Sequence, residues 1–192
     1  MAVGLATGSD KPVRRKRMMA GLNAIPNVPV LTHEGESVRF YDDLVKDRVV
    51  TFNAMYMSCG DSCPLITQNL RYVQDLLGDR AGRDIFMYSI TLQPETDTVQ
   101  ALQSYAKLFR VKPGWKFITG KPEHIEELRF ALGFYDRDPV VDALYSQHTG
   151  ILRFGNERLR RWAGCPAMAR PAAIVATITS SMSLPDASTA TI

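Results

Sequence analysis

The sequence predicts an α/β domain whose central sheet contains parallel strands, and three observations lead to this prediction. Residues 49–57 and 84–92 are almost continuously apolar and rich in β-branched and aromatic side chains, as expected of strands buried on both faces of a sheet. Each run is followed by a segment with the apolar periodicity of a helix, at 64–77 and 97–109. Strands that alternate with helices, without an internal repeat, are typical of α/β folds.

The first predicted elements are a hairpin and, after the strand that follows it, a helix. Residues 28–31 and 38–41 predict a β-hairpin around a short turn. His33 lies in this turn beside two glutamates, and we expect it to be a solvated turn residue rather than a metal ligand. The helix at 64–77 has one apolar stripe, which should pack on the sheet, and a glycine follows it as a stop signal. The stripe consists of Ile66, Leu70, Val73 and Leu77.

The middle of the chain predicts two further helices and a strand between them. Asp97 is the expected cap of the first helix, with a glutamine three residues later. A strand is expected at 115–119, and a helix that begins at Pro122 and ends at Gly133 follows it. His124 lies in the first turn of that helix, where we expect an exposed, structural side chain.

The last part of the chain has a different pattern. Residues 135–147 predict a long acidic loop, and two short strands at 148–154 and 157–163 follow, joined by a two-residue Gly-Asn turn. Residues 171–182 predict a closing helix.

Composition suggests one globular domain with two flexible ends. We divide the chain into a flexible basic N-terminal arm at 1–25, a domain at 26–182 and a flexible tail at 183–192. Apolar residues make up 45% of the sequence, and the net charge of +3 is mild. We therefore expect no nucleic-acid partner and no membrane span. The arginines of the arm lack the apolar run that an export signal needs.

Two cysteines follow the first buried strand and are the main functional signal. Cys59 and Cys63 are four positions apart, and Pro64 suits the first turn of a helix. Residues four apart in a helix rise about 6 Å and share a face, so both sulfurs can approach one metal ion, but the spacing also allows a disulfide. A helix N-terminus favours the thiolate form. The alternative is a pair of unrelated buried cysteines, and the strand–turn–helix setting argues against it.

These motifs resemble the SCO/SenC family of thioredoxin-fold copper proteins. The resemblance rests on the strand that leads into Cys59-x-x-x-Cys63-Pro, on the SIT and PETDT sequences at 89–91 and 94–98, and on His148 at the start of the late hairpin.

The resemblance covers residues 26–182 and implies a thioredoxin-like fold, with a central mixed sheet flanked by helices, an N-terminal β-hairpin and a late β-hairpin insertion. It also implies that Cys59, Cys63 and His148 bind copper, as Cu(I) or Cu(II). Two thiolates and an imidazole suit these ions. Zinc fits the same donors, but a structural zinc site usually has four protein ligands.

The sequence departs from the family pattern at two positions, and a third cysteine needs a separate explanation. Gln93 stands where the family usually has Asp, and Gln147 precedes His148 where an acidic residue is common, so the tuning of the metal ligands should differ.

With the two-residue turn, Cys165 would lie opposite Ser146 at the rim of the site. There it could contact copper or form an alternative disulfide, although an inert thiol is the stronger expectation.

The resemblance implies a copper chaperone. Such a protein would deliver copper to, or prepare the cysteines of, the binuclear copper centre of cytochrome c oxidase subunit II, or serve another copper acceptor, and it would not be an enzyme. The alternative is a thiol-disulfide oxidoreductase with Cys59 and Cys63 as the catalytic redox pair, served by a thioredoxin-like reductant. A peroxidase is least favoured because no Thr-x-x-Cys motif precedes Cys59. The family resemblance places the protein in the periplasm or on the periplasmic side of the inner membrane.

Overall fold

The computed structural model describes residues 25–60, 62–148 and 150–183, except for the side chains of Ser146 and His148. The predictions for the N-terminal arm and the C-terminal tail therefore fall almost entirely outside the described residues. Within these residues no helix is both long and apolar enough to cross a bilayer.

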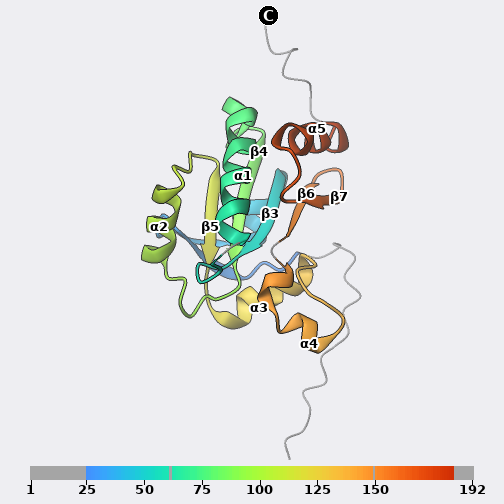
Figure 1. Cartoon of the computed structure of the whole chain (residues 1–192). Helices are drawn as coiled ribbons and strands as arrows, with labels where there is room; N and C mark the ends of the chain where they lie inside the picture. The colour runs from blue at the N-terminus through green and yellow to red at the C-terminus, as the bar shows by residue number, and fades with distance from the viewer. Residues whose placement is uncertain (1–24, 61, 149, 184–192) are drawn as a thin grey trace, which may run out of the picture.

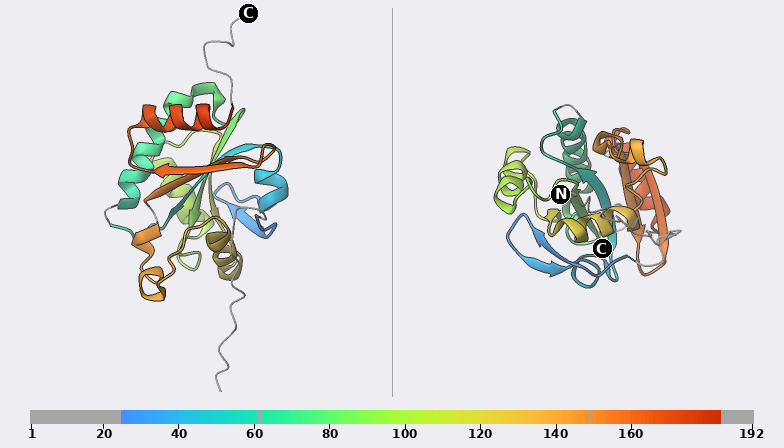
Figure 2. Two further views of the ribbon diagram at one scale, coloured as in Figure 1. Left: turned by 90° about the vertical axis from the view of Figure 1, so that its right-hand side faces the viewer. Right: turned by 90° about the horizontal axis from the view of Figure 1, so that it is seen from below.

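The described strands form one mixed sheet in the order β2-β1-β5-β4-β3-β6-β7 (Figure 1). β3, β4 and β5 are parallel to one another, whereas β1 pairs with β5, and β6 with β3, in the antiparallel sense. The two hairpins extend the sheet at its opposite ends, and the β6–β7 hairpin faces the viewer in the left view of Figure 2. The strands are β1 (Pro29–Thr32), β2 (Ser37–Arg39), β3 (Val49–Met55), β4 (Ile85–Thr91), β5 (Trp115–Thr119), β6 (Ile151–Asn156) and β7 (Arg161–Pro166).

Helices cover both faces of the sheet, because successive residues of a buried strand point to opposite sides. Met55 of β3 packs into a core with α1, α2 and α5, whereas its neighbour Ala54 packs into a second core with α3 and the π-helix η1. The predicted stripe of α1 is buried in the first core. The helices are η1 (Phe40–Val45), α1 (Ser62–Leu77), η2 (Gly78–Arg80), α2 (Val99–Leu108), α3 (Pro122–Ala131), α4 (Pro139–Asp142), η3 (Tyr145–His148) and α5 (Pro171–Ser181).

The predicted cap of α2 is wrong by one residue. Thr98 is the N-cap, and its hydroxyl accepts a hydrogen bond from the Ala101 amide at 3.2 Å. Asp97 is buried instead and accepts hydrogen bonds from the Thr91 hydroxyl at 2.5 Å and from the Met57 amide at 3.2 Å. The carboxylate of Asp97 therefore joins the segment after β4 to the segment after β3.

The predictions for the two turn histidines had different outcomes. His33 is not a solvated turn residue: it is 9% exposed, and its Nδ1 accepts a hydrogen bond from the Phe117 amide at 3.2 Å. His33 is buried because β1 pairs with β5, a contact that local sequence does not reveal. Burial lowers the pKa of His33. His124 is structural, as predicted, and its Nδ1 forms a hydrogen bond with the Pro29 carbonyl at 3.0 Å.

The register predicted for the late hairpin is also wrong. β6 begins at Ile151, and the strands are joined by four residues rather than two, so that Asn156 pairs with Arg161. The longer turn is held by Glu157, which is buried and accepts hydrogen bonds from the Tyr41 hydroxyl at 2.8 Å and from the Asp47 amide at 3.1 Å. Contacts with a distant part of the chain therefore override the Gly-Asn turn signal.

The segment expected to be a long acidic loop contains α4 and η3 and is anchored by a buried ion pair. Arg129 of α3 donates two hydrogen bonds to the Asp142 carboxylate, at 2.7 and 2.9 Å. Their side chains are 5% and 11% exposed. Asp142 also accepts a hydrogen bond from the Asp136 amide at 2.8 Å, so one carboxylate fixes the connection between α3 and β6.

The substitution Asp142→Asn should lower the free energy of unfolding by about 3 kcal/mol, because it leaves the buried Arg129 cation without its bidentate carboxylate. Urea unfolding would measure this loss. Glu126→Gln is the matched control: it removes the other carboxylate on Arg129, which is 42% exposed, and should cost about 1 kcal/mol or less. Equal losses in the two variants would contradict the anchoring role of Asp142.

Candidate metal centre

The two cysteines lie where β3 ends and α1 begins. The Cys59 amide donates a hydrogen bond to the Tyr56 carbonyl at 3.3 Å, which closes a turn after the strand. Cys63 is the second residue of α1, and Pro64 follows within the first turn, as predicted, where a missing N–H needs no partner. All three cysteines of the chain are thiols in this structure. Cys59 is 8% exposed and Cys63 is 1% exposed, so Cys59 is the more accessible sulfur.

Hydrogen bonds stabilise the thiolate form of Cys59. Burial opposes ionisation, but the Ser62 hydroxyl, the backbone N–H and thiol of Cys63 and the Tyr56 hydroxyl together lower the Cys59 pKa to about 6. The Cys59 Sγ lies 3.1 Å from the Ser62 Oγ. Cys59 is therefore mostly thiolate at neutral pH.

Two tyrosines surround the sulfurs and remain protonated. Burial, followed by the hydrogen bond with Cys59, raises the pKa of Tyr56 to about 12. Burial also raises the pKa of Tyr105 to about 12, and its hydroxyl lies 3.0 Å from that of Thr67. Sequence analysis missed the contribution of Tyr56. The available signal was a phenol hydroxyl at the end of an otherwise apolar strand, since a buried tyrosine hydroxyl needs a hydrogen-bond partner.

The loop after β4 contacts the cysteine turn through Gln93. The Ser58 hydroxyl donates a hydrogen bond to the Gln93 Oε1 at 2.7 Å. Gln93, where the family usually has Asp, therefore contacts the residue that directly precedes Cys59. The expectation that the tuning of the metal ligands differs from the family pattern stays a prediction.

The backbone of His148 lies in η3, directly before β6. The Tyr145 ring of the same turn packs edge-on against Tyr56, with ring centroids 6.1 Å apart. The turn is thereby linked to the segment that carries Cys59. The His148 side chain lies outside the described part of the structure, so its role as a ligand stays a prediction. Among the side chains that are described, no three His, Cys, Asp or Glu residues form a possible metal site.

The acidic residues before His148 have structural partners. Asp138 caps α4 by accepting a hydrogen bond from the Val140 amide at 2.8 Å, and Asp136 accepts one from the Asp138 amide at 2.8 Å. Asp142 binds Arg129, as described above.

The expected position of Cys165 is wrong. Because the hairpin has a four-residue turn, Cys165 pairs with Leu152 and not with Ser146. It is partly buried against the core on the α1 side of the sheet, and burial raises the pKa of its thiol. The register argument for a position at the rim of the site is thereby removed, and the features of Cys165 are those of an inert thiol.

A pair of cysteines between the end of a central parallel strand and the first turn of the helix that follows it defines a thiol protein of the thioredoxin-like class. A family model described as SCO1/SenC matches residues 29–182, and the chain belongs to this family.

Individual relatives agree with this assignment. The chain is 31% identical over 94 residues to the mitochondrial SCO1 homolog 1 of Arabidopsis thaliana, an alignment that covers 45% of this chain and 28% of the relative. The chain thus spans less than a third of that relative's length.

Two solved structures confirm the thioredoxin-like fold. The copper-bound ScoI of Arabidopsis thaliana has a TM-score of 0.62 at 18% identity, and the match covers 82% of this chain and 98% of that chain. The second structure is that of BsSco, a member of the Sco family of cytochrome c oxidase assembly proteins in which a disulfide switch was identified. It has a TM-score of 0.63 at 19% identity, and the match covers 84% of this chain and 94% of that chain.

Replacing the hydroxyl that contacts the Cys59 sulfur should raise the pKa of this thiol. In Ser62→Ala the pKa should rise from about 6 by about one pH unit, because a hydrogen bond to a charged group is worth about 1.5 kcal/mol or more. The alkylation rate of Cys59 as a function of pH, followed by mass spectrometry of the reduced protein, measures this change. Ser104→Ala, which removes an exposed hydroxyl of α2, is the control. An unchanged midpoint in Ser62→Ala would contradict the assigned cause.

Proposed function

We propose that this protein is a copper chaperone that binds its cargo through Cys59, Cys63 and His148. It delivers copper to, or prepares the cysteines of, the binuclear copper centre of cytochrome c oxidase subunit II, or it serves another copper acceptor. The observation that carries the proposal is the pair of cysteines where β3 ends and α1 begins, together with the hydrogen bonds that lower the Cys59 pKa to about 6. The copper-bound relative and the assembly role of BsSco's family support the same cargo and acceptor.

The donors at the site fit copper better than other biological metals. Sulfur donors are soft and suit Cu(I), and an added imidazole also accommodates Cu(II). Cys59 is already mostly ionised at neutral pH, so only the Cys63 proton has to leave when copper binds. Two thiolates and one imidazole are one ligand short of a closed structural zinc site, and an open site suits a cargo that must be released.

The position of the His148 backbone supports its role as the third ligand. β6 follows η3 and pairs with β3, which leads into the cysteine turn. The packing of Tyr145 on Tyr56 and the Arg129–Asp142 ion pair limit the movement of the connection that ends at His148. These contacts support a position of the η3 backbone near the cysteine turn, which a third ligand from this turn requires.

Copper binding by the fully reduced protein tests this proposal. We expect one equivalent of copper, measured by metal analysis after gel filtration, and loss of that equivalent in Cys59→Ser, in Cys63→Ser and in His148→Ala. His124→Ala and Cys165→Ser are matched controls that should retain it, because they remove the same donor types away from the site. Full binding by His148→Ala, or loss in either control, would refute the three-ligand site.

Thiol-disulfide exchange is the second candidate, and the low Cys59 pKa favours it as well. The Cys59 thiolate attacks a disulfide of the target, forms a mixed disulfide and releases one target thiolate. The Cys63 thiolate then attacks Cys59 and releases the second, which leaves a Cys59–Cys63 disulfide that a thioredoxin-like reductant reduces. The target gains the two electrons that this protein loses. The greater exposure of Cys59 makes it the attacking sulfur.

His148 separates the two functions. In His148→Ala the rate at which the reduced protein reduces a dithiobis(nitrobenzoate) probe should stay within about twofold of the parent rate, while copper binding is lost. A protein that binds no copper in its parent form and reduces the probe at an unchanged rate in His148→Ala would be an oxidoreductase and not a chaperone.

The compartment is part of the same proposal. Family membership supports action in the periplasm or on the periplasmic side of the inner membrane, where the protein would meet the proposed copper acceptor.

A further inference from the structure

Arg153 points to the face of the sheet opposite the cysteines. Its neighbours in β6, Leu152 and Phe154, belong to the core that contains Cys59 and Cys63. Because side chains alternate along a strand, Arg153 projects to the other face, where α3 packs. Its guanidinium reaches Gly133, which directly follows the end of α3, and its Nη2 donates a long hydrogen bond to the Gly133 carbonyl at 3.4 Å.

Two glycines make the space for this side chain. A Cβ at Gly133 would lie 3.1 Å from the Arg153 Nη2, and a Cβ at Gly164, its partner on β7, would lie 3.4 Å from the Arg153 Cδ. Gly133 also has a φ of +78°, a conformation that other residues rarely adopt. The Arg153 side chain therefore lies in a channel between two elements that are distant in sequence.

Among the described residues, the guanidinium of Arg153 has no carboxylate partner and only one long hydrogen bond. Its Nε is buried without a hydrogen-bond partner, and within the described residues no carboxylate lies within ion-pair distance of it. Arg129, the comparable cation of α3, has the carboxylates of both Asp142 and Glu126. Partial burial of a cation without a counter-charge costs free energy, and an anionic ligand would offset this cost.

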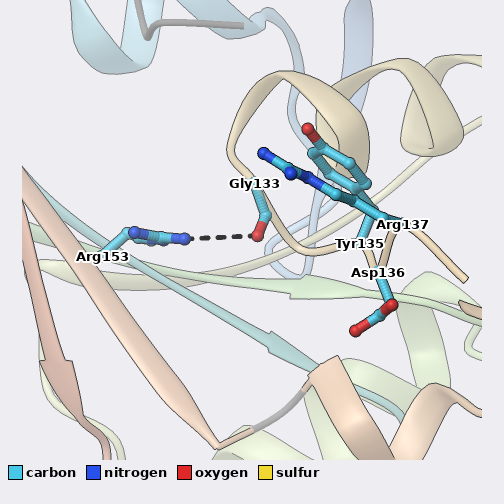
Figure 3. A pocket seen from close by; sticks show the side chains of 5 residues that line it. All are labelled: Gly133, Tyr135, Asp136, Arg137 and Arg153. Carbon is cyan, nitrogen blue, oxygen red and sulfur yellow. Dashed lines mark hydrogen bonds between the residues drawn. The ribbon is translucent and has the colours of Figure 1, made fainter. Parts of the chain in front are cut away.

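A pocket with a second arginine adjoins this guanidinium (Figure 3). It has a volume of about 440 Å³ and is lined by Gly133, Tyr135, Asp136, Arg137 and Arg153. Arg137 is exposed and has no carboxylate partner among the described residues. The Asp136 carboxylate accepts a hydrogen bond from the Asp138 amide and, in Figure 3, points to the other side from the Arg137 guanidinium.

We propose that this pocket binds a carboxylate between Arg153 and Arg137. Two guanidinium groups at one hollow repel each other unless an anion lies between them, and the planar fork of arginine matches a carboxylate. Tyr135, which also lines the pocket, offers its hydroxyl as a neutral donor. The nearby negative charge of Asp136 disfavours a phosphate dianion more than a single carboxylate. The carboxylate belongs either to a small organic acid or to an acidic side chain of a partner protein.

NMR titration of the reduced, copper-free protein tests the pocket, because the Nε–H signals of arginines report anion binding directly. The probes are acetate, citrate, an acetyl-Glu-Glu-amide peptide and inorganic phosphate, all at constant ionic strength. We expect saturable shifts of the Arg153 signal in the parent protein. Binding should be at least about tenfold weaker in Arg137→Gln, followed by the Arg153 signal, and in Arg153→Met, followed by the Arg137 signal. Arg158→Gln is the control, because it removes the same charge from an exposed position in the β6–β7 turn.

The outcomes separate the possible sources of the carboxylate. Saturation by acetate or citrate supports a small organic acid, and saturation by the peptide alone supports an acidic side chain of a partner. Shifts that do not saturate, equal weakening in Arg158→Gln, or tighter binding of phosphate than of any carboxylate would overturn the proposal. Should Arg153→Met not fold, Arg137→Gln, an exposed substitution, still decides it. Loss of copper binding in the variants of Cys59 or His148 has no bearing on this pocket, so the two proposals can fail independently.

Discussion

The enclosure of β3 is the constraint on which the arrangement of the thiols depends. All its residues are buried, and it pairs with β4 along one edge and with β6 along the other. Its backbone hydrogen bonds are therefore satisfied within the sheet, and the point at which the chain leaves it is fixed. The cysteine turn emerges there between the loop after β4, held by Asp97 and Gln93, and the η3 turn before β6. Segments far apart in sequence meet because of strand pairing, and not because any local motif brings them together.

The pKa of Cys59 results from burial and hydrogen bonding, which act in opposite directions. Burial favours the neutral thiol, and the opposing contributions come from hydroxyl, thiol and backbone donors. Tyr56 and Tyr105 stay protonated and add no negative charge to the site. A thiolate stabilised by hydrogen bonds keeps its full charge, and this charge can be neutralised either by binding a metal cation or by forming a disulfide. The same electrostatics thus supports both candidate functions, and the proposed ligand His148 is what would distinguish them.

Local patterns in the sequence were sufficient for the strands and helices of the central fold and for the position of the cysteine pair. Apolar runs and helical stripes reflect burial directly, so β3 and α1 could be predicted within a few residues. The errors occurred where a distant residue determines the local structure. Glu157 is fixed by Tyr41 and Asp47, and this changes the late turn and the register of β7. Asp97 and His33 have partners from other strands, so neither acts as its local sequence suggested.

β6 separates two features that the simple strand pattern does not explain, the backbone turn before it and the Arg153 side chain within it. His148 precedes the strand at the end near the cysteine turn, whereas Arg153 projects toward α3. Because β6 is hydrogen bonded to β3 and to β7 along its length, its side chains cannot exchange faces without breaking both ladders. A carboxylate held by Arg153 and a metal ion held by the thiols would therefore occupy separate volumes. The two ligands need not compete, and a partner that contributes the carboxylate could bind while the thiol site is loaded.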